Sequence, residues 1–167
     1  MFVLGIDPGS ARMGFGLVRE AGDGSFLAER YGVLETPAHE ALGKRLLLLY
    51  EALCRLISET HPQSAAVESL FFKNNAKTAV AVGEARGVAL LALAQAGTPV
   101  FEYSPPQVKQ AITGYGGAQK HQVQEMTRLL LNLPEIPRPD DAADALAIAY
   151  CHLQYQRLSR LAEDSSA

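Results

Sequence analysis

The segment FVLGIDPG, residues 2–9, is the most informative stretch of this 167-residue chain. Residues 2–6 are an apolar run that predicts a fully buried strand, and Asp7 follows it before a Pro-Gly turn. An ionised carboxylate at the tip of a buried strand is costly unless a partner, a hydrogen bond or a cation compensates it. Asp7 is therefore a candidate site residue, and Gly9 leaves room for a phosphate or for a neighbouring hairpin.

The composition is that of one globular domain, since 48% of the residues are hydrophobic. We expect a single domain over residues 1–162 and a short flexible tail over residues 163–167. The longest apolar stretch, residues 88–96, is too short to span a bilayer, and the first residues lack the basic flank of a signal peptide. A cytoplasmic location is therefore expected. Cys54 and Cys151 lack CxxC spacing and are expected to be buried thiols.

Hydrophobic periodicity and turn residues predict an α/β domain. The expected strands cover residues 2–6, 13–18, 26–34, 64–67 and 99–103, and the expected helices cover residues 40–60, 75–96, 108–112, 120–131 and 141–161. Short connections make the first three strands an antiparallel meander, and crossover helices add the last two as parallel strands. The prediction is a five-stranded mixed sheet flanked by helices, in which Pro105-Pro106 closes the fifth strand.

Glu68 repeats the situation of Asp7, because it follows the apolar residues 65–67 at the end of the fourth expected strand. If the first and fourth strands are parallel neighbours, both carboxylates emerge at the same carboxyl edge of the sheet. Ligands of open α/β sheets bind at that edge, where the strand order reverses. The two acids are therefore expected to face each other.

Three further acids, Asp140, Asp141 and Asp144, open the last expected helix. Asp141 and Asp144 are three residues apart and share one helical face. Acids at a helix start commonly cap backbone N–H groups, which is the preferred interpretation of Asp140. A cap needs one side chain only, so Asp141 and Asp144 are better explained as site residues.

Four carboxylates without a neutralising base near them in the sequence repel one another unless hard cations hold them together. Carboxylate oxygens favour Mg²⁺, with Mn²⁺ as an alternative. Two such ions about 4 Å apart suit phosphodiester cleavage, because one generates the attacking hydroxide and the other stabilises the leaving oxygen. The four acids together thus indicate a metal-dependent hydrolase.

Several motifs then resemble the bacterial RuvC Holliday-junction resolvases, over nearly the whole chain. They are GIDPGS at residues 5–10 with Gly14 and Gly16, VE at 67–68, ARG at 85–87, VKQ at 108–110, Lys120, and DAADALA at 141–147. The resemblance implies a ribonuclease H-like fold, a homodimer, Mg²⁺ dependence and paired symmetric nicks in a four-way DNA junction during recombination and repair. It also implies the RuvA-RuvB branch-migration complex as a partner.

By the same resemblance the catalytic and metal-binding acids are Asp7, Glu68, Asp141 and Asp144. Some relatives carry His at the position of Asp141, so the ligand set here would be all oxygen. Asp140 and His121 are possible auxiliary residues. The candidate DNA-binding residues are Phe71, Phe72, Lys73, Lys77, Arg86, Lys109 and Lys120.

These candidates rest on different reasoning. Adjacent phenylalanines in a polar loop cannot easily both point inward, and an exposed ring could stack on an unpaired base; the resemblance gives that role to Phe71. Lys109 and Lys120 have family counterparts near the scissile phosphate. The formal net charge is −3, but residues 73–128 hold six Lys or Arg against three acids. Phosphate contacts are therefore expected in that segment.

Two equivalent nicks require two equivalent sites, and so a two-fold interface. Ala79, Gly83 and Gly87 place small residues four apart on the long helix, which is by resemblance the candidate interface. Small residues at this spacing more commonly allow a helix to lie close to its own sheet. Both interpretations stay open.

Three alternative functions compete with the resolvase. An actin-like or sugar-kinase-like ATPase shares the strand, the Asp and the hairpin, but needs two such domains. A ribonuclease H-like nuclease acting on ribosomal RNA precursors shares the Asp-Gly opening, although residues 68–71 and the DAAD helix favour the resolvase. A junction-binding module without catalysis would not need all four acids.

Overall fold

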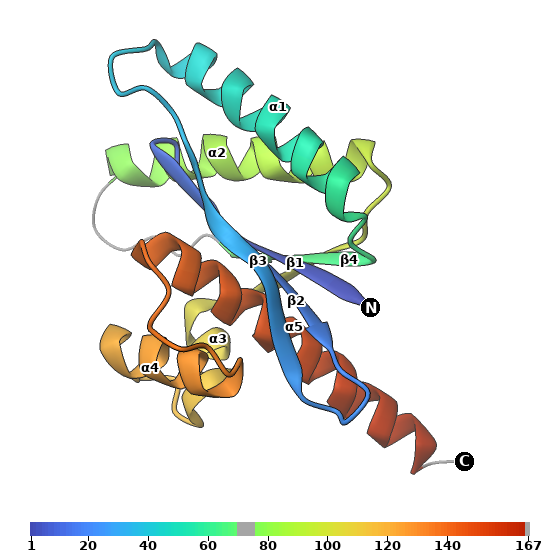
Figure 1. Cartoon of the computed structure of the whole chain (residues 1–167). Coiled ribbons are helices and arrows are strands. Elements are labelled where there is room, and N and C mark those ends of the chain that lie inside the picture. Colours follow the sequence, from blue (N-terminus) through green and yellow to red (C-terminus); the bar gives the residue numbers. More distant parts are fainter. Residues whose placement is uncertain (70–75, 166–167) are drawn as a thin grey trace.

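The chain folds around one mixed β-sheet with helices on both faces (Figure 1). The computed structural model describes residues 1–69 and 76–165, with residues 76–78 described by their backbone alone. The strands are β1 (Phe2–Asp7), β2 (Arg12–Glu20), β3 (Phe26–Glu35), β4 (Ser64–Glu68) and β5 (Val100–Tyr103). The helices are α1 (Leu42–Thr60), α2 (Ala76–Gln95), α3 (Pro105–Thr113), α4 (Lys120–Leu130) and α5 (Asp140–Asp164).

The strand order β3-β2-β1-β4-β5 confirms the predicted mixed sheet. Strands β1, β2 and β3 pair antiparallel, whereas β1, β4 and β5 are parallel. Ile6 pairs with Val67 in the β1–β4 register, so the next residues, Asp7 and Glu68, end neighbouring strands at the same edge. Asp7 is also paired with Gly14 across the hairpin.

Alternate residues of β1 point into two separate hydrophobic cores, as the period of a strand requires. Leu4 and Ile6 belong to the core under α1 and α2, and Val3 to the core under α5, α3 and α4. Figure 1 shows α1 and α2 on one side of the sheet and the other three helices on the opposite side. Strand β1, which carries Asp7, is thus covered on both faces.

Glycines let α5 lie directly on the backbone of β1 and β2. A Cβ atom on Gly5 would lie 2.0 Å from the carbonyl oxygen of Ala145, and one on Gly14 would lie 2.0 Å from the carbonyl oxygen of Asp141. Neither distance is possible for a real side chain, and backbone atoms cannot easily yield. The absence of these two Cβ atoms therefore fixes how close α5 comes to the sheet.

His152 joins α5 to the two parallel strands on its side. Its Nε2 is 3.0 Å from the Ser64 hydroxyl at the start of β4, and its Nδ1 is 2.8 Å from the Tyr103 hydroxyl at the end of β5. The imidazole is fully buried, and burial lowers the pKa of His152 to about 4. A neutral ring therefore holds both hydroxyl groups and ties α5 to β4 and β5.

Several expected boundaries differ from the structure, most clearly those of α3 and α5. Pro105 and Pro106 open α3 instead of only closing β5, because proline suits the first helical turn and Ser104 forms a capping box with Gln107. Helix α5 begins at Asp140 and runs through Asp164, so the expected tail starts too early at residue 163. The N–H and the hydroxyl of Ser165 both bond to the carbonyl of Leu161 and end the helix.

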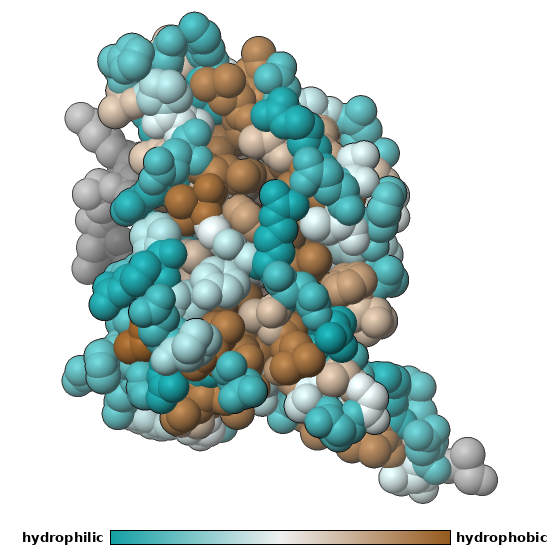
Figure 2. Space-filling model, viewed as in Figure 1, coloured by the Kyte–Doolittle hydropathy of each residue, from teal (hydrophilic) through white to brown (hydrophobic). Residues whose placement is uncertain are grey.

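The surface mixes polar and apolar residues. On the face seen in Figure 2, hydrophobic side chains form several groups between hydrophilic ones. None of the helices in the described part of the chain has the length and apolar character needed to cross a membrane. Both cysteines are free, with Cys151 buried and Cys54 only half-buried, so the expectation of a buried thiol is wrong for Cys54.

Substitution of Gly14 by alanine should separate α5 from β2, because the new methyl group would collide with the backbone of Asp141. We expect Gly14→Ala to lower the free energy of unfolding by about 3 kcal/mol or more, the upper range for overpacking. Gly43→Ala is the control, since a Cβ there has nothing within 4 Å. Chemical denaturation of both variants is the measurement, and equal stabilities would contradict the close approach.

Candidate active site

Three of the four predicted acids line one cavity of about 230 Å³ at the carboxyl edge of the sheet. Asp7 comes from β1, Glu68 from β4 and Asp144 from α5. Lys109 of α3 and Lys120 of α4 line the same cavity, and its floor is apolar, with Val108, Val123, Ala147 and Ile148. Residues from five elements, which lie between Asp7 and Ile148 in the sequence, therefore converge here.

The fourth acid, Asp141, lies one helical turn before Asp144 and does not line the cavity as the structure stands. Its negative charge nevertheless acts on both Asp7 and Asp144. The backbone of Asp141 is the part of α5 that touches Gly14 of β2. The close packing of α5 on the hairpin therefore brings Asp141 to the rim of the same site.

Asp7 has the most strongly perturbed carboxyl group of the four. Burial, and then the negative charges of Asp144, Glu68 and Asp141, raise the pKa of Asp7 from 3.8 to about 7. Lys120 opposes this shift but does not cancel it. In the absence of a cation, Asp7 is thus held in a place where its charge is poorly compensated, as the position at the strand tip predicts.

The pKa values of the other two cavity acids, Glu68 and Asp144, are raised for similar reasons but less strongly. Burial and the charge of Asp144 raise the pKa of Glu68, against the opposing charges of Lys109 and Lys120. Burial also raises the pKa of Asp144, although its hydrogen bond with Lys120 counteracts the effect. Titratable groups with raised pKa values in a cavity are typical of functional sites.

Basic side chains lie closer to the acids than the sequence interpretation assumed. The Lys120 Nζ is 3.1 Å from an Asp144 oxygen and 3.3 Å from an Asp140 oxygen. The Arg12 Nε is 3.4 Å from an Asp141 oxygen. The expectation of acids without nearby bases is therefore wrong, and Arg12, only five residues after Asp7, was overlooked because an exposed arginine in a turn resembles any surface charge.

Asp140 does not cap α5. The residue before the helix is Pro139, and no side chain accepts a capping hydrogen bond there. The Asp140 carboxylate is instead bonded to Lys120, which lowers its pKa, and it lies 3.5 Å from an Arg138 nitrogen. Its place in the first turn still complements the helix dipole. The capping interpretation of Asp140 is therefore wrong.

The donor set has the chemistry of a site for hard divalent cations, because Asp7, Glu68, Asp141 and Asp144 offer carboxylate oxygens only. Within residues 1–69 and 76–165, no group of three or more His, Cys, Asp or Glu side chains is arranged closely enough to hold an ion. Lys120 and Arg12 occupy positions against Asp144 and Asp141. The residues fit the metal by their chemistry, and their side chains would have to move together to enclose it.

The predicted DNA-binding residues have different positions. Phe71, Phe72 and Lys73 lie outside the described residues, as does the side chain of Lys77. Lys109 and Lys120 lie at the acids.

Arg86 is only 15% exposed and forms an ion pair with Glu102 of β5. His121 is exposed on α4 and does not line the cavity. DNA-contact roles for these residues stay predictions.

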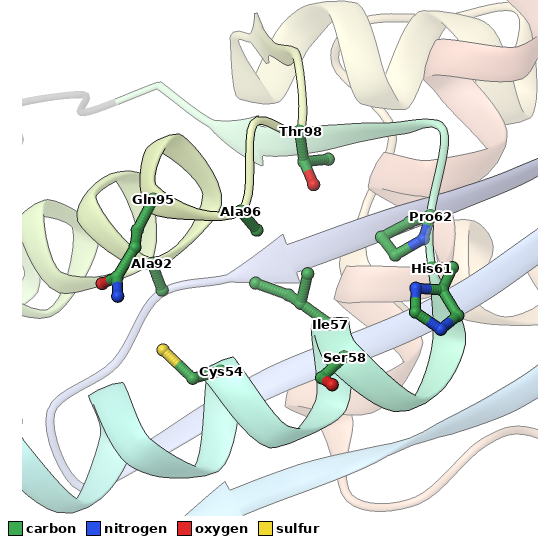
Figure 3. A pocket seen from close by; sticks show the side chains of 9 residues that line it. All are labelled: Cys54, Ile57, Ser58, His61, Pro62, Ala92, Gln95, Ala96 and Thr98. Atoms are coloured by element: carbon green, nitrogen blue, oxygen red, sulfur yellow. The ribbon is translucent and has the colours of Figure 1, made fainter.

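A second hollow, of about 430 Å³, lies between α1 and α2 (Figure 3). His61, Pro62 and Thr98 on its wall precede β4 and β5, so it lies at the opposite ends of the parallel strands. Its described lining residues include no acid. The acids and the lysines therefore single out the smaller cavity as the candidate active site.

Comparisons with known proteins agree with this geometry. The family model described as "Crossover junction endodeoxyribonuclease RuvC" matches residues 3–152. A relative of that name from Roseiflexus sp. (strain RS-1) is 58% identical over 161 residues, which are 96% of this chain and 95% of the relative.

Two solved structures of RuvC from Thermus thermophilus are 39% identical to the chain and cover 95% of it. The match to the first structure covers 97% of the solved chain and has a TM-score of 0.88. The second structure is in complex with Holliday junction substrate, and the match to it covers 96% of the solved chain with a TM-score of 0.89. With a family match over most of its length and a cavity of acids at the expected sheet edge, the chain belongs to the RuvC family of crossover junction endodeoxyribonucleases.

Proposed function

We propose that the cavity of Asp7, Glu68 and Asp144, together with Asp141, is the centre that cleaves four-way DNA junctions by metal-assisted phosphodiester hydrolysis. The observation that carries the proposal is the convergence of these acids in one cavity beside Lys109 and Lys120, where burial and the neighbouring acids raise the pKa of Asp7. Divalent cations compensate the negative charge of such acids, and junction DNA brings the phosphate. The solved Thermus thermophilus relative in complex with Holliday junction substrate supports this choice of DNA.

The four acids would hold Mg²⁺, with Mn²⁺ as an alternative, and two ions per site suit a set of four carboxylates. When bound, such ions supply a hydroxide nucleophile and stabilise the charge of the leaving oxygen. The protein contributes the positions of the acids, fixed by β1, β4 and α5, and the apolar floor that limits access of water. Metal identity and number are part of the proposal.

Lys109 and Lys120 would hold the phosphate. Both line the cavity, and the positive charge of each already acts on Glu68. A lysine ammonium group beside the scissile phosphate stabilises the negative charge that develops during hydrolysis. Lys120 must first leave Asp144 and Asp140, which is feasible because its side chain is 55% exposed.

A two-fold dimer would give the two sites needed for paired nicks, and α2 offers a suitable face. Val80 and Leu91 are 61% and 59% exposed, and a Cβ on Gly87 would have nothing within 4 Å. With Glu84 and Ala94 these residues are exposed at alternating steps of four and three, the spacing of a helix–helix seam. Of the small residues singled out in the sequence, Gly87 lies on this face, whereas Ala79 and Gly83 are half-buried.

A cytoplasmic location and an association with the RuvA-RuvB branch-migration complex complete the proposal. The association follows from the resemblance of the chain to its family, and the location is the expectation from the sequence. Processing ribosomal RNA precursors is less favoured, because the curated relatives that match over nearly the whole chain are named as junction endonucleases.

Cleavage of a synthetic four-way junction tests the active site. The protein should convert it to nicked duplexes with Mg²⁺ and not with EDTA. Asp7→Asn and Glu68→Gln should each lower the cleavage rate by at least about 100-fold. Substituting residues that only hydrogen-bond to metal ligands already lowers metal affinity or activity about 10- to 100-fold. Asp23→Asn, in the distant β2–β3 turn, is the matched control. Cleavage by either active-site variant at the control rate would refute the assignment, provided that gel-shift assays show junction binding.

Stability without metal tests the charge at Asp7. The raised pKa means that the folded state holds the Asp7 proton more tightly than the unfolded state, so this group costs stability as the pH rises from 3.8 through about 7. Asp7→Asn should therefore raise the free energy of unfolding in EDTA by up to about 4 kcal/mol at pH 8 and by about 1.7 kcal/mol at pH 5. Mg²⁺ should stabilise the wild type more than the variant. If Asp7→Asn raised the free energy of unfolding equally at both pH values, the charge of Asp7 would not be what costs stability.

The oligomeric state tests the α2 face. A charge in place of an apolar seam residue would be buried without a partner, so Leu91→Glu should yield monomers and slow paired cleavage. Leu129→Glu on α4 is the control, because Leu129 is 54% exposed and lies on a helix of the other layer. Sedimentation velocity at the concentration of the cleavage assay distinguishes the two. A Leu91→Glu dimer as stable as the Leu129→Glu dimer would place the interface elsewhere.

A further inference from the structure

Arg12 lies beside the acids but has no role in the function proposed above. It opens β2, directly after the turn that follows Asp7, and its Nε is 3.4 Å from an oxygen of Asp141. Lys120 faces the other side of the acid cluster, against Asp144 and Asp140. Each of the two acids on α5 that the proposed metal site needs is therefore already paired with a basic side chain.

The backbone beneath Arg12 is held in place. In the β2–β3 sheet register, the backbone of Arg12 lies opposite that of Glu35. A Cβ on Gly9 would lie 2.2 Å from the Arg12 carbonyl oxygen, so the turn between these residues is tight. The Thr36 hydroxyl donates a hydrogen bond to the Ser10 carbonyl and accepts one from Arg45 Nε. Because the turn is tied to β3 and α1, only the Arg12 side chain is free to change its contact.

The partner of Arg12 is equally well placed. The Asp141 backbone packs on Gly14 of β2, two residues from Arg12. The distance between the backbones of Arg12 and Asp141 is therefore set by the contact of α5 with the hairpin. A pair built on two fixed elements forms whenever no stronger cation competes for the carboxylate.

The pair is exposed enough to be exchanged. The Arg12 and Asp141 side chains are 51% and 30% exposed, and ion pairs in contact with water contribute little to stability. A divalent cation carries twice the charge of a guanidinium and binds carboxylate oxygen directly. The guanidinium and the metal ion compete for the same carboxylate group.

We propose that Arg12 is a positioning residue that occupies Asp141 in the metal-free protein and gives up this carboxylate when a divalent cation binds. The inference rests on the proposed metal site and adds a built-in competitor to it. Arg12 lowers the repulsion among the acids before metal arrives, and in doing so it weakens the binding of the metal. A residue that merely supported the structure of the site would have the opposite effect, because its loss would weaken metal binding.

Mn²⁺ binding without DNA tests the proposal, with free Mn²⁺ followed by electron paramagnetic resonance. Arg12→Gln should bind Mn²⁺ about threefold more tightly than the wild type, which is within the range that an exposed ion pair is worth. Arg12→Lys keeps a competing charge and should lie closer to the wild type. Arg30→Gln is the matched control, because it removes the same formal charge. Arg30 is 52% exposed, and its ion pair is with Glu59 of α1 instead of with an acid of the site.

The outcomes separate this inference from the proposed function. Mn²⁺ binding by the wild type that is lost in Asp7→Asn supports the metal site. If Arg12→Gln then binds Mn²⁺ no more tightly than Arg30→Gln, the role of Arg12 is refuted and the metal site stands. If the wild type binds no more Mn²⁺ than Asp7→Asn, the metal site itself is refuted, and the exchange with it. Tighter binding by Arg12→Gln alone supports the inference.

Discussion

The contact between α5 and the bare backbone of β1 and β2 determines the geometry of the site. With side chains at Gly5 and Gly14, the helix would have to rise from the sheet, because a Cβ at either position would lie 2.0 Å from a carbonyl oxygen of the helix. Asp141 and Asp144 would then move away from Asp7 and Glu68. On the far end of the contact, His152 fastens the same helix to β4 and β5. The first half of the helix, from Asp141 to His152, is thus held relative to the strands that carry the other acids.

This rigidity is combined with electrostatic repulsion. The backbone brings like charges together, and the cost appears in the pKa of Asp7, which burial and three neighbouring acids raise to about 7. Lys120 and Arg12 offset part of the repulsion through contacts of 3.1–3.4 Å at the edge of the site. The scaffold is therefore fixed, whereas the countercations are side chains that water already reaches. Such an arrangement lets charges be exchanged without disturbing the fold.

The parts of this site that the sequence predicts are those that depend on local periodicity. Asp7 and Glu68 were identifiable because each ends an apolar run, and Asp141 and Asp144 because their spacing puts them on one helical face. Connection lengths indicated which strands are antiparallel and which are parallel, whereas the adjacency of β1 and β4 was only assumed and comes from the structure. Contacts between distant elements were not predictable in the same way.

The Arg12–Asp141 pair, for example, depends on the packing of a turn against a helix start. Gly9 shows the same limit: the sequence left a phosphate or a hairpin as its reason, and the structure shows a tight hairpin at the Arg12 carbonyl. Asp140 was misread as a cap because a capping acid and an ion-paired acid look alike in sequence. What separates them is Lys120, which is 20 residues away.

Charge balance links the metal-free structure to the proposed reaction. In the proposed site, two divalent cations would neutralise the four carboxylates in their fully ionised form. Lys109, Lys120 and Arg12 would then have no acid left to compensate within the four, and their positive charge would become available beside the cavity. A DNA phosphate is the anion that would meet it there. Under this proposal the same basic side chains compensate the acids before metal binds and favour the substrate afterwards, so that a cluster of acids in a protein of net charge −3 would still receive a polyanion.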